Sequence, residues 1–261
     1  MKTFNYHVAK DSKEASKLSS SSSAFLAGGM TSIPSVKLGL ATYKDIIDIK
    51  HIKKLSGIKV SGKSVTIGAT TKHADVANSK EIKKAIPSLA KLAGGIGDAQ
   101  VRNRGTVGGS IANNDPSACY PSACMALNAI IHTNDRKIEA SKFFRGMFET
   151  ALKKGELIEA VEFQIPEKSN YQKHPNPASR YAIVGVYVAK HKKEVNVAIT
   201  GAKSVVYVDK DLSKTLSNSF SSSALDGMKL DGSEMNSDVH ASGDFRASLV
   251  ATYTKKAVEA C

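Results

Sequence analysis

The order of apolar and polar positions along the chain predicts helices and strands in separate blocks. Helical spacing over residues 12–18 predicts a short helix, which is followed by a polyserine loop. Short apolar runs at 24–29 and 46–49 predict two buried strands. Alternating β-branched residues on either side of positions 61–63 predict a hairpin.

The middle of the chain shows helical periodicity that a proline interrupts. Residues 72–78 and 79–93 predict helices. The second carries apolar residues at helical spacing, and Pro87 demands a kink or a break within it. After a second glycine-rich region, residues 119–132 form a buried apolar segment of mixed type.

The last part of the chain predicts strands followed by helices. Two strands are expected at 137–144 and 157–165. A proline-rich stretch at 166–177 then marks the best domain boundary. Three further strands, expected to be antiparallel, follow within 179–209, and helices from about residue 213 are expected to cover the sheet. Segregated strands and helices indicate an α+β fold.

Composition sets the broad class. The chain has 261 residues, which favours two domains or subdomains over one. It is 41% hydrophobic and 23% charged, as in ordinary globular proteins. The N-terminus has no apolar segment of signal-peptide length, and no apolar run approaches eighteen residues. Three cysteines argue against a disulfide framework, so a cytoplasmic location is expected.

The net charge of +13 raises nucleic acid as a partner, but the charge distribution argues against it. Lysines are scattered over the chain, often near acidic residues, and Trp is absent. Base readout favours clustered arginine, and single-strand binding favours interleaved aromatics. A lysine-rich solvated surface is the better interpretation.

Several short motifs point to chemistries that their context does not support. Residues 57–64 fit the phosphate-loop pattern G-x-x-x-x-G-K-S, but a strand rather than a helix is expected after them. The segment from Gly95 lacks the third glycine of a dinucleotide fingerprint. The histidines show no paired spacing, and three cysteines cannot supply the four ligands of an ordinary iron–sulfur cluster. No catalytic residues and no metal site are therefore predicted.

Two glycine pairs remain, in "LAGGMTS" and in "RNRGTVGGS". Glycine lets backbone N–H groups turn toward a ligand and lets the ligand approach closely. Successive amides that point one way bind anions. The two loops could grip a pyrophosphate, with hydroxyl groups from Thr31, Ser32, Thr106 and Ser110 as further donors. The alternative is that both are merely tight turns.

At these residues the chain resembles a known family. "LAGGMTSIPSVK", "IGDAQVRNRGTVGGSIANNDPSACYPSA" and "FFRGMFETAL" resemble the FAD-binding subunit of molybdenum hydroxylases, in particular the medium subunit of aerobic-type carbon monoxide dehydrogenase in the xanthine dehydrogenase family. "PASRYAIVGVYVA", "VAITGA" and "DVHASGDFRASLV" resemble its C-terminal domain. The resemblance implies a PCMH-type FAD domain over 1–172, with parts at about 1–55 and 56–172. A smaller domain over 173–261, with a three-stranded antiparallel sheet and helices, would follow.

The resemblance also implies which residues hold FAD. The pyrophosphate loops would be Ala27, Gly28, Gly29, Met30, Thr31 and Ser32, then Thr106, Val107, Gly108, Gly109 and Ser110. Ile96 matches a position near the isoalloxazine, and Asn113, Asn114 and Asp115 occupy the turn toward the ribose and adenine. Many relatives carry aspartate where this chain has Cys119, which puts one ribose contact in doubt. Tyr181 is either a lid over the flavin or a core aromatic.

The resemblance finally implies partners. In such enzymes a large molybdopterin subunit oxidises the substrate, and a small iron–sulfur subunit passes electrons to FAD in this subunit. Two alternatives stay open, namely a self-sufficient flavin oxidase and a basic binding module without redox activity.

Arg102 and Arg104 are expected to brace the second loop through backbone carbonyls rather than to contact the pyrophosphate.

Overall fold

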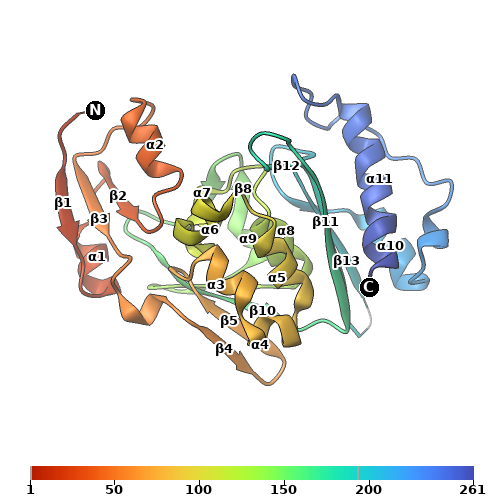
Figure 1. Ribbon diagram of the computed structural model, residues 1–261, viewed down its shortest axis with the longest axis horizontal. Helices are drawn as coiled ribbons and strands as arrows, with labels where there is room; N and C mark the ends of the chain where they lie inside the picture. Colours follow the sequence, from red (N-terminus) through yellow and green to blue (C-terminus); the bar gives the residue numbers. More distant parts are fainter. Residues whose placement is uncertain (1, 193) are drawn as a thin grey trace.

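Three main sheets follow one another along the chain in the computed structural model, which describes residues 2–192 and 194–261 (Figure 1). The first is a small parallel sheet with strand order β1-β3-β2. Its strands are β1 (Asn5–Val8), β2 (Ser23–Leu26) and β3 (Asp45–Asp48). Helix α1 (Ser12–Leu18), which coincides with the predicted helix, packs Ala15 into the same small core as Ile47. Helix α2 (Ser32–Lys37) follows β2, and a 3₁₀ turn at Lys53–Leu55 ends this part.

The central sheet is antiparallel, with strand order β4-β5-β10-β6-β7. Its strands are β4 (Ile58–Ser61), β5 (Ser64–Gly68), β6 (Ile130–Thr133), β7 (Lys137–Glu139) and β10 (Ile158–Gln164). The predicted hairpin is confirmed, because Ser61 pairs with Ser64 across a tip where Gly62 has φ +58°. The phosphate-loop pattern is therefore a β-hairpin, and no helix follows it.

Helices surround this sheet and supply most of the core. They are α3 (His73–Asn78), α4 (Lys80–Ala85), α5 (Pro87–Gly94), α6 (Ala99–Arg104), α7 (Val107–Asn113), α8 (Tyr120–Ala126) and α9 (Ala140–Phe143). The break at Pro87 is confirmed, with the proline at the first turn of α5, where its missing N–H costs nothing. The expected strand at 137–144 is wrong in part. It divides into β7, α9 and β8 (Phe144–Gly146), and β8 pairs with β9 (Glu149–Thr150).

The third sheet is antiparallel, with order β11-β12-β13-β14. Its strands are β11 (Lys168–Pro175), β12 (Ala182–Lys190), β13 (Val195–Thr200) and β14 (Tyr207–Val208). It has four strands rather than the three expected, because β11 runs through the proline-rich stretch. Pro166 precedes this strand, Pro175 ends it and Pro177 follows it. None of them therefore removes a backbone hydrogen bond from the interior of the strand.

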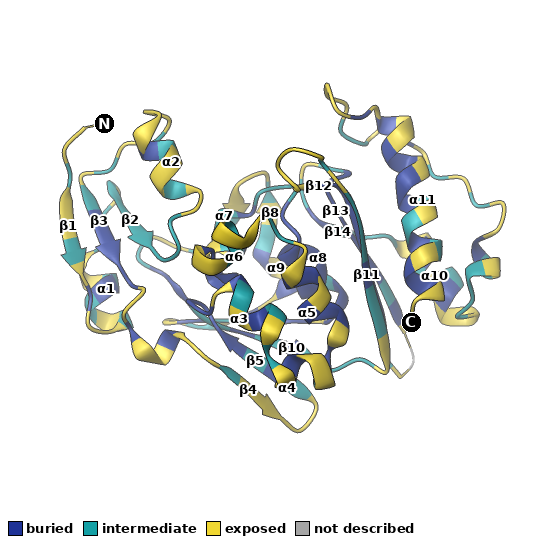
Figure 2. Cartoon of the chain, in the orientation of Figure 1, coloured by how far each residue is buried: buried dark blue, intermediate teal, exposed yellow. Residues whose placement is uncertain are grey.

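Helices α10 (Lys210–Asn218) and α11 (Gly243–Glu259) cover the outer face of this sheet, as expected, with a 3₁₀ turn at Ser222–Leu225 between them. The other face packs on α5 and α8, where Tyr171 and Tyr187 join the core of the central part. Strand β12 is buried along almost its whole length (Figure 2). No helix among the described residues is long and apolar enough to cross a membrane. The mixed α+β architecture is confirmed.

Candidate functional site

The first glycine loop leaves the carboxyl edge of the parallel sheet, directly after β2. Gly29 has φ +73°, a conformation that glycine adopts at little cost. Within residues 2–192 and 194–261, no oxygen accepts a hydrogen bond from the backbone N–H groups of residues 28–32. These neighbouring free amides, on a part-exposed loop, form the kind of donor set that binds an anion.

The second glycine loop joins α6 to α7 and is built differently. The Thr106 hydroxyl accepts from the Gly109 N–H at 3.2 Å, while Val107 and Gly108 donate to the carbonyls of Thr71 and Ala69. A Cβ on Gly108 would lie 2.5 Å from the Ala69 Cβ. The amides here are thus largely used within the protein, and Gly108 permits close packing. Gly109 is exposed, so at this residue the backbone itself is open to a ligand.

The fold brings the two loops into contact although about eighty residues separate them. A Cβ on Gly28 would lie 2.2 Å from the Arg104 carbonyl oxygen and 2.9 Å from the Gly105 Cα. Only glycine allows this approach. The free amides of the first loop therefore lie beside the turn that leads into the second.

The segment before the second loop is braced by arginine and supported by a buried histidine. Arg102 donates to the Ile96 carbonyl at 3.0 Å and to the Gly97 carbonyl at 2.9 Å, which confirms the bracing role for this arginine. The Arg104 side chain is exposed, and it is the Arg104 carbonyl that lies against Gly28 in the contact between the loops. His73 lies beneath Gly105, and burial, followed by the Arg102 charge, lowers the pKa of His73 to about 4.

The turn after α7 contacts the third sheet. Asp115 accepts from the Ser117 N–H at 2.8 Å, and burial raises the pKa of Asp115. Tyr181 precedes β12 and is 43% exposed, so it is not a core residue. Burial and the Asp115 carboxylate raise the pKa of Tyr181, while the Thr31 hydroxyl lowers it. These effects place Tyr181 close to both the first loop and Asp115.

Asn114 and Lys173 have structural roles that the sequence pattern did not reveal. Asn114 is buried and donates to the carbonyls of Gly146 and Glu149, both at 2.8 Å, so its side chain holds the β8–β9 hairpin. On β11, the Lys173 ammonium donates to the Gly95 and Arg180 carbonyls at 2.7 and 2.9 Å. It also lies 3.6 Å from the buried Cys119 sulfur.

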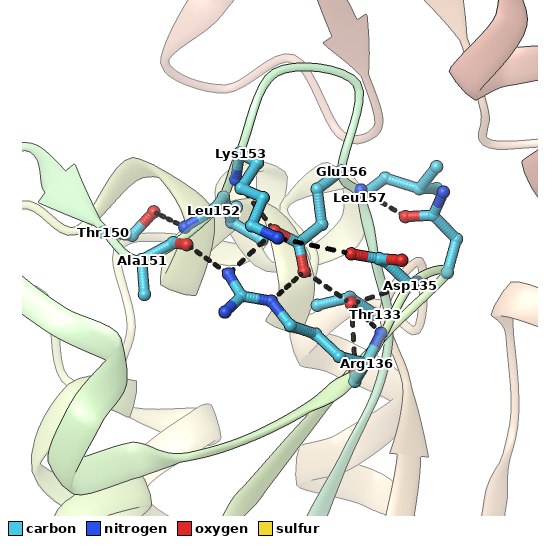
Figure 3. Close-up of polar contacts among 10 residues, drawn as sticks. Thr133, Asp135, Arg136, Thr150, Ala151, Leu152, Lys153, Glu156 and Leu157 are labelled. Carbon is cyan, nitrogen blue, oxygen red and sulfur yellow. Dashed lines mark hydrogen bonds and ion pairs between the residues drawn. The ribbon is translucent and has the colours of Figure 1, made fainter.

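An ion pair between the buried Glu156 and the part-exposed Arg136 lies at the joint between the first two parts of the chain (Figure 3). Glu156 is buried and accepts two hydrogen bonds from Arg136, at 2.9 and 3.1 Å, and one from Thr133 at 2.8 Å. These partners outweigh desolvation and lower the pKa of Glu156 to about 2. The adjoining Gly155 carbonyl accepts from Ser16 of α1. The cluster thereby sets the position of the parallel sheet and of its glycine loop.

Residues 2–167 match the model of the FAD binding domain in molybdopterin dehydrogenase. The chain belongs to this family.

The chain is similar to medium chains of dehydrogenases from several organisms. The glyceraldehyde dehydrogenase medium chain of Sulfolobus acidocaldarius is 36% identical over 194 residues, or 71% of this chain and 69% of the relative. The carbon monoxide dehydrogenase medium chain of Hydrogenophaga pseudoflava is 30% identical over 278 residues, which cover 98% of this chain and 96% of the relative. The solved reconstituted CO dehydrogenase from Oligotropha carboxidovorans superimposes with a TM-score of 0.91 at 26% identity, over 99% of this chain and 97% of that one.

The protein is thus an FAD-binding medium subunit of the molybdenum hydroxylases, an oxidoreductase family, as the resemblance implied. The loops fit the cofactor on physical grounds. FAD carries a pyrophosphate with two negative charges. Residues 28–32 offer free amides beside the turn at Arg104 and Gly105, which leads into the loop where the Gly109 backbone is exposed. No group of three or more His, Cys, Asp or Glu side chains in the described ranges is arranged to hold a metal ion.

Proposed function

We propose that this chain is the flavin electron-transfer subunit of a three-subunit molybdenum hydroxylase. A large molybdopterin subunit would oxidise the substrate, and a small iron–sulfur subunit would pass the electrons on to this chain. When bound, FAD supplies the ability to accept those electrons and release them to an acceptor. The proposal is supported most directly by the two adjoining glycine loops in a chain that belongs to an FAD-binding family.

The chain's own residues would hold the cofactor in place. The free amides of residues 28–32 and the Gly109 backbone would bind the pyrophosphate, together with the hydroxyl groups of Thr31, Ser32 and Ser110. Thr106, Val107 and Gly108 would shape the second loop. Ile96, Asn113 and Asp115 would border the rest of the cofactor, and Ala27 and Met30 would flank the first loop.

Tyr181 would act as a lid residue rather than as part of the core, because it is exposed and close to Thr31. Lys173 supports this role indirectly. It anchors the Arg180 carbonyl, next to Tyr181, to Gly95 of the central part. The lid would therefore be held on the FAD-binding domain even before the cofactor is bound.

The domain division proposed here keeps the FAD-binding domain at 1–172 and the C-terminal domain at 173–261. The division falls within β11, whose Tyr171 packs in the core of the central part. The two domains would therefore move together as one body. Medium chains of similar sequence serve enzymes named for different substrates, which supports the proposal that the large subunit determines the substrate.

The test is to assay dye reduction by this chain alone, and by this chain with its large and small subunits. We expect no substrate-dependent reduction by the isolated FAD-loaded chain and robust reduction by the assembled complex. Turnover by the isolated chain would instead identify a self-sufficient flavin oxidase. A chain that stays colourless after incubation with FAD would favour the basic binding module.

A further inference from the structure

The ammonium group of Lys173 is held between two carbonyls and a sulfur. It donates to the Gly95 carbonyl at 2.7 Å and to the Arg180 carbonyl at 2.9 Å. It also lies 3.6 Å from the Sγ atom of Cys119. An ammonium has three N–H donors, so these three contacts use all of them and fix the nitrogen beside the sulfur. In residues 2–192 and 194–261, the other two cysteines have no such contact with a lysine.

A tyrosine hydroxyl without a partner lies at the same sulfur. Tyr171 is buried, and its hydroxyl has no hydrogen-bond partner among the described residues. Burial raises the pKa of Tyr171, and the adjacent Cys119, whose sulfur is only a weak acceptor, raises it further. Gly185 packs against this hydroxyl, since a Cβ there would lie 2.5 Å from the Tyr171 oxygen. An unsatisfied buried hydroxyl costs free energy, and an oxygen atom bound to the Cys119 sulfur would give it an acceptor.

The sulfur is shielded, but its lysine neighbour is open to solvent. Cys119 is 5% exposed, whereas Lys173 is part-exposed. A molecule as small as dioxygen can therefore approach the pair along the lysine side chain. Cys119 immediately precedes α8, and Lys173 lies on β11. A bond between the two side chains would cross the division that we propose between the two domains.

We propose that Cys119 and Lys173 form a modification site, at which dioxygen joins the sulfur to the nitrogen through one oxygen atom. The thiol, the ammonium and one dioxygen would give the S–O–N bridge, one water and one proton. The S–H bond and two of the three N–H bonds break. Sulfur and nitrogen each lose two electrons, which reduce the dioxygen. One of its oxygen atoms becomes the bridge, and the other leaves as water.

The geometry fits this bridge better than the simpler products of cysteine oxidation. The 3.6 Å between sulfur and nitrogen is much longer than a direct S–N bond, and a single bridging atom fits after a small approach. Oxidised cysteine sulfur is commonly capped by a neighbouring thiol or nitrogen. Here Lys173 is the neighbouring nitrogen, and the Tyr171 hydroxyl would donate to the bridging oxygen.

The bridge would strengthen the joint between β11 and the start of α8. Lys173 would keep one N–H, so it would release one of its two carbonyl acceptors. Against this loss, Cys119 and Lys173 are 54 positions apart, and a covalent link between them restricts the unfolded chain. The bridged protein should therefore be more stable than the reduced protein, although one hydrogen bond is lost.

The experiment exposes the purified full chain to dioxygen in the dark and keeps a matched sample anaerobic with dithiothreitol. Intact mass spectrometry should show that the oxidised chain has gained one oxygen and lost two hydrogens. A protease digest should contain the Cys119 peptide joined to the Lys173 peptide. The melting temperature should rise by about 5 °C on bridging. Dithiothreitol should reverse both changes.

Three variants identify the atoms involved. Cys119→Ser removes the sulfur, and Lys173→Gln removes the amine but keeps N–H donors, so neither variant should show the mass change or the rise in melting temperature. Cys261→Ser removes a part-exposed thiol that has no lysine contact among the described residues, and this matched control should behave as wild type.

The digest of the wild-type chain decides the proposal even if a variant folds poorly. An unchanged wild-type mass after exposure to dioxygen would overturn it. A gain of oxygen without loss of hydrogen would show a sulfenic acid, and a loss of hydrogen without gain of oxygen would show a direct bond to sulfur. Either result would also overturn the bridge, as would a mass change that persists in Lys173→Gln.

Discussion

Mild acid should destabilise this protein through His73, the buried histidine beneath the second glycine loop. The His73 backbone N–H donates to the Gly105 carbonyl at 3.0 Å, and the His73 ring centroid lies 5.3 Å from that of Tyr120. The side chain is 4% exposed, and its Nδ1 has no hydrogen-bond partner among the described residues. A proton on this ring would therefore be buried without compensation, close to the positive charge of Arg102.

The size of the effect follows from the two pKa values. The folded state keeps the pKa of His73 at about 4, whereas the unfolded chain has the ordinary value of about 6.5. The unfolded state thus binds more protons between these values, so stability falls as the pH drops from 6.5 toward 4. Between about pH 7 and pH 5 this one group should remove about 2 kcal/mol of unfolding free energy, and about 3 kcal/mol once the pH is below 4.

The assay is urea denaturation at about pH 7 and pH 5 for wild type, His73→Gln and His240→Gln. Glutamine cannot titrate, so His73→Gln should lose about 2 kcal/mol of the pH dependence, whatever its absolute stability. The exposed His240 provides the matched control, and His240→Gln should keep the wild-type dependence. An identical pH dependence in His73→Gln and wild type would refute the reasoning about burial.

Four further outcomes are expected. Heat denaturation of the purified holoprotein should release one FAD per chain, and release of FMN would contradict the assignment. Glu156→Gln should lower the unfolding free energy by about 2 kcal/mol, because it breaks the ion pair with Arg136. Since the folded pKa of Glu156 is about 2, this stabilisation is present above pH 4.5 and is lost as the pH falls toward 2, which acid titration of both proteins would show. Lys63→Ala should leave the FAD Kd unchanged, and a marked loss would revive the phosphate-loop interpretation. The isolated chain should not reduce dyes with any substrate of the complex, as activity assays with and without partners would show.

Local chemistry could be predicted well from the sequence wherever one short segment decides the structure. Helix α1, the hairpin at Gly62 and the break at Pro87 each depend on neighbouring residues alone. The glycine loops were also recognisable, because glycine pairs flanked by hydroxyl residues are typical of anion binding. The place of β11 was missed, because prolines at the ends of a strand look like a linker until the partner strand is known.

The sequence could not predict which of the two glycine loops keeps its backbone amides free for a ligand. Both glycine loops have similar composition, but only the first keeps its amides free, because Thr71 and Ala69 from another segment accept those of the second. The bracing by Lys173 likewise depends on three segments that tertiary packing brings together. Such roles follow from contacts between distant residues, which no local pattern encodes.

The most direct test of the two-loop site compares the FAD affinity of three glycine variants. Gly29→Val and Gly62→Val place the same side chain at positive φ, +73° and +58°, but only Gly29 lies in a proposed binding loop. Gly109→Val adds a side chain to an exposed backbone in the second loop. We predict that the FAD Kd rises at least about tenfold in Gly29→Val and Gly109→Val and stays within about twofold of wild type in Gly62→Val. Equal FAD affinity in all three variants and wild type would contradict the account.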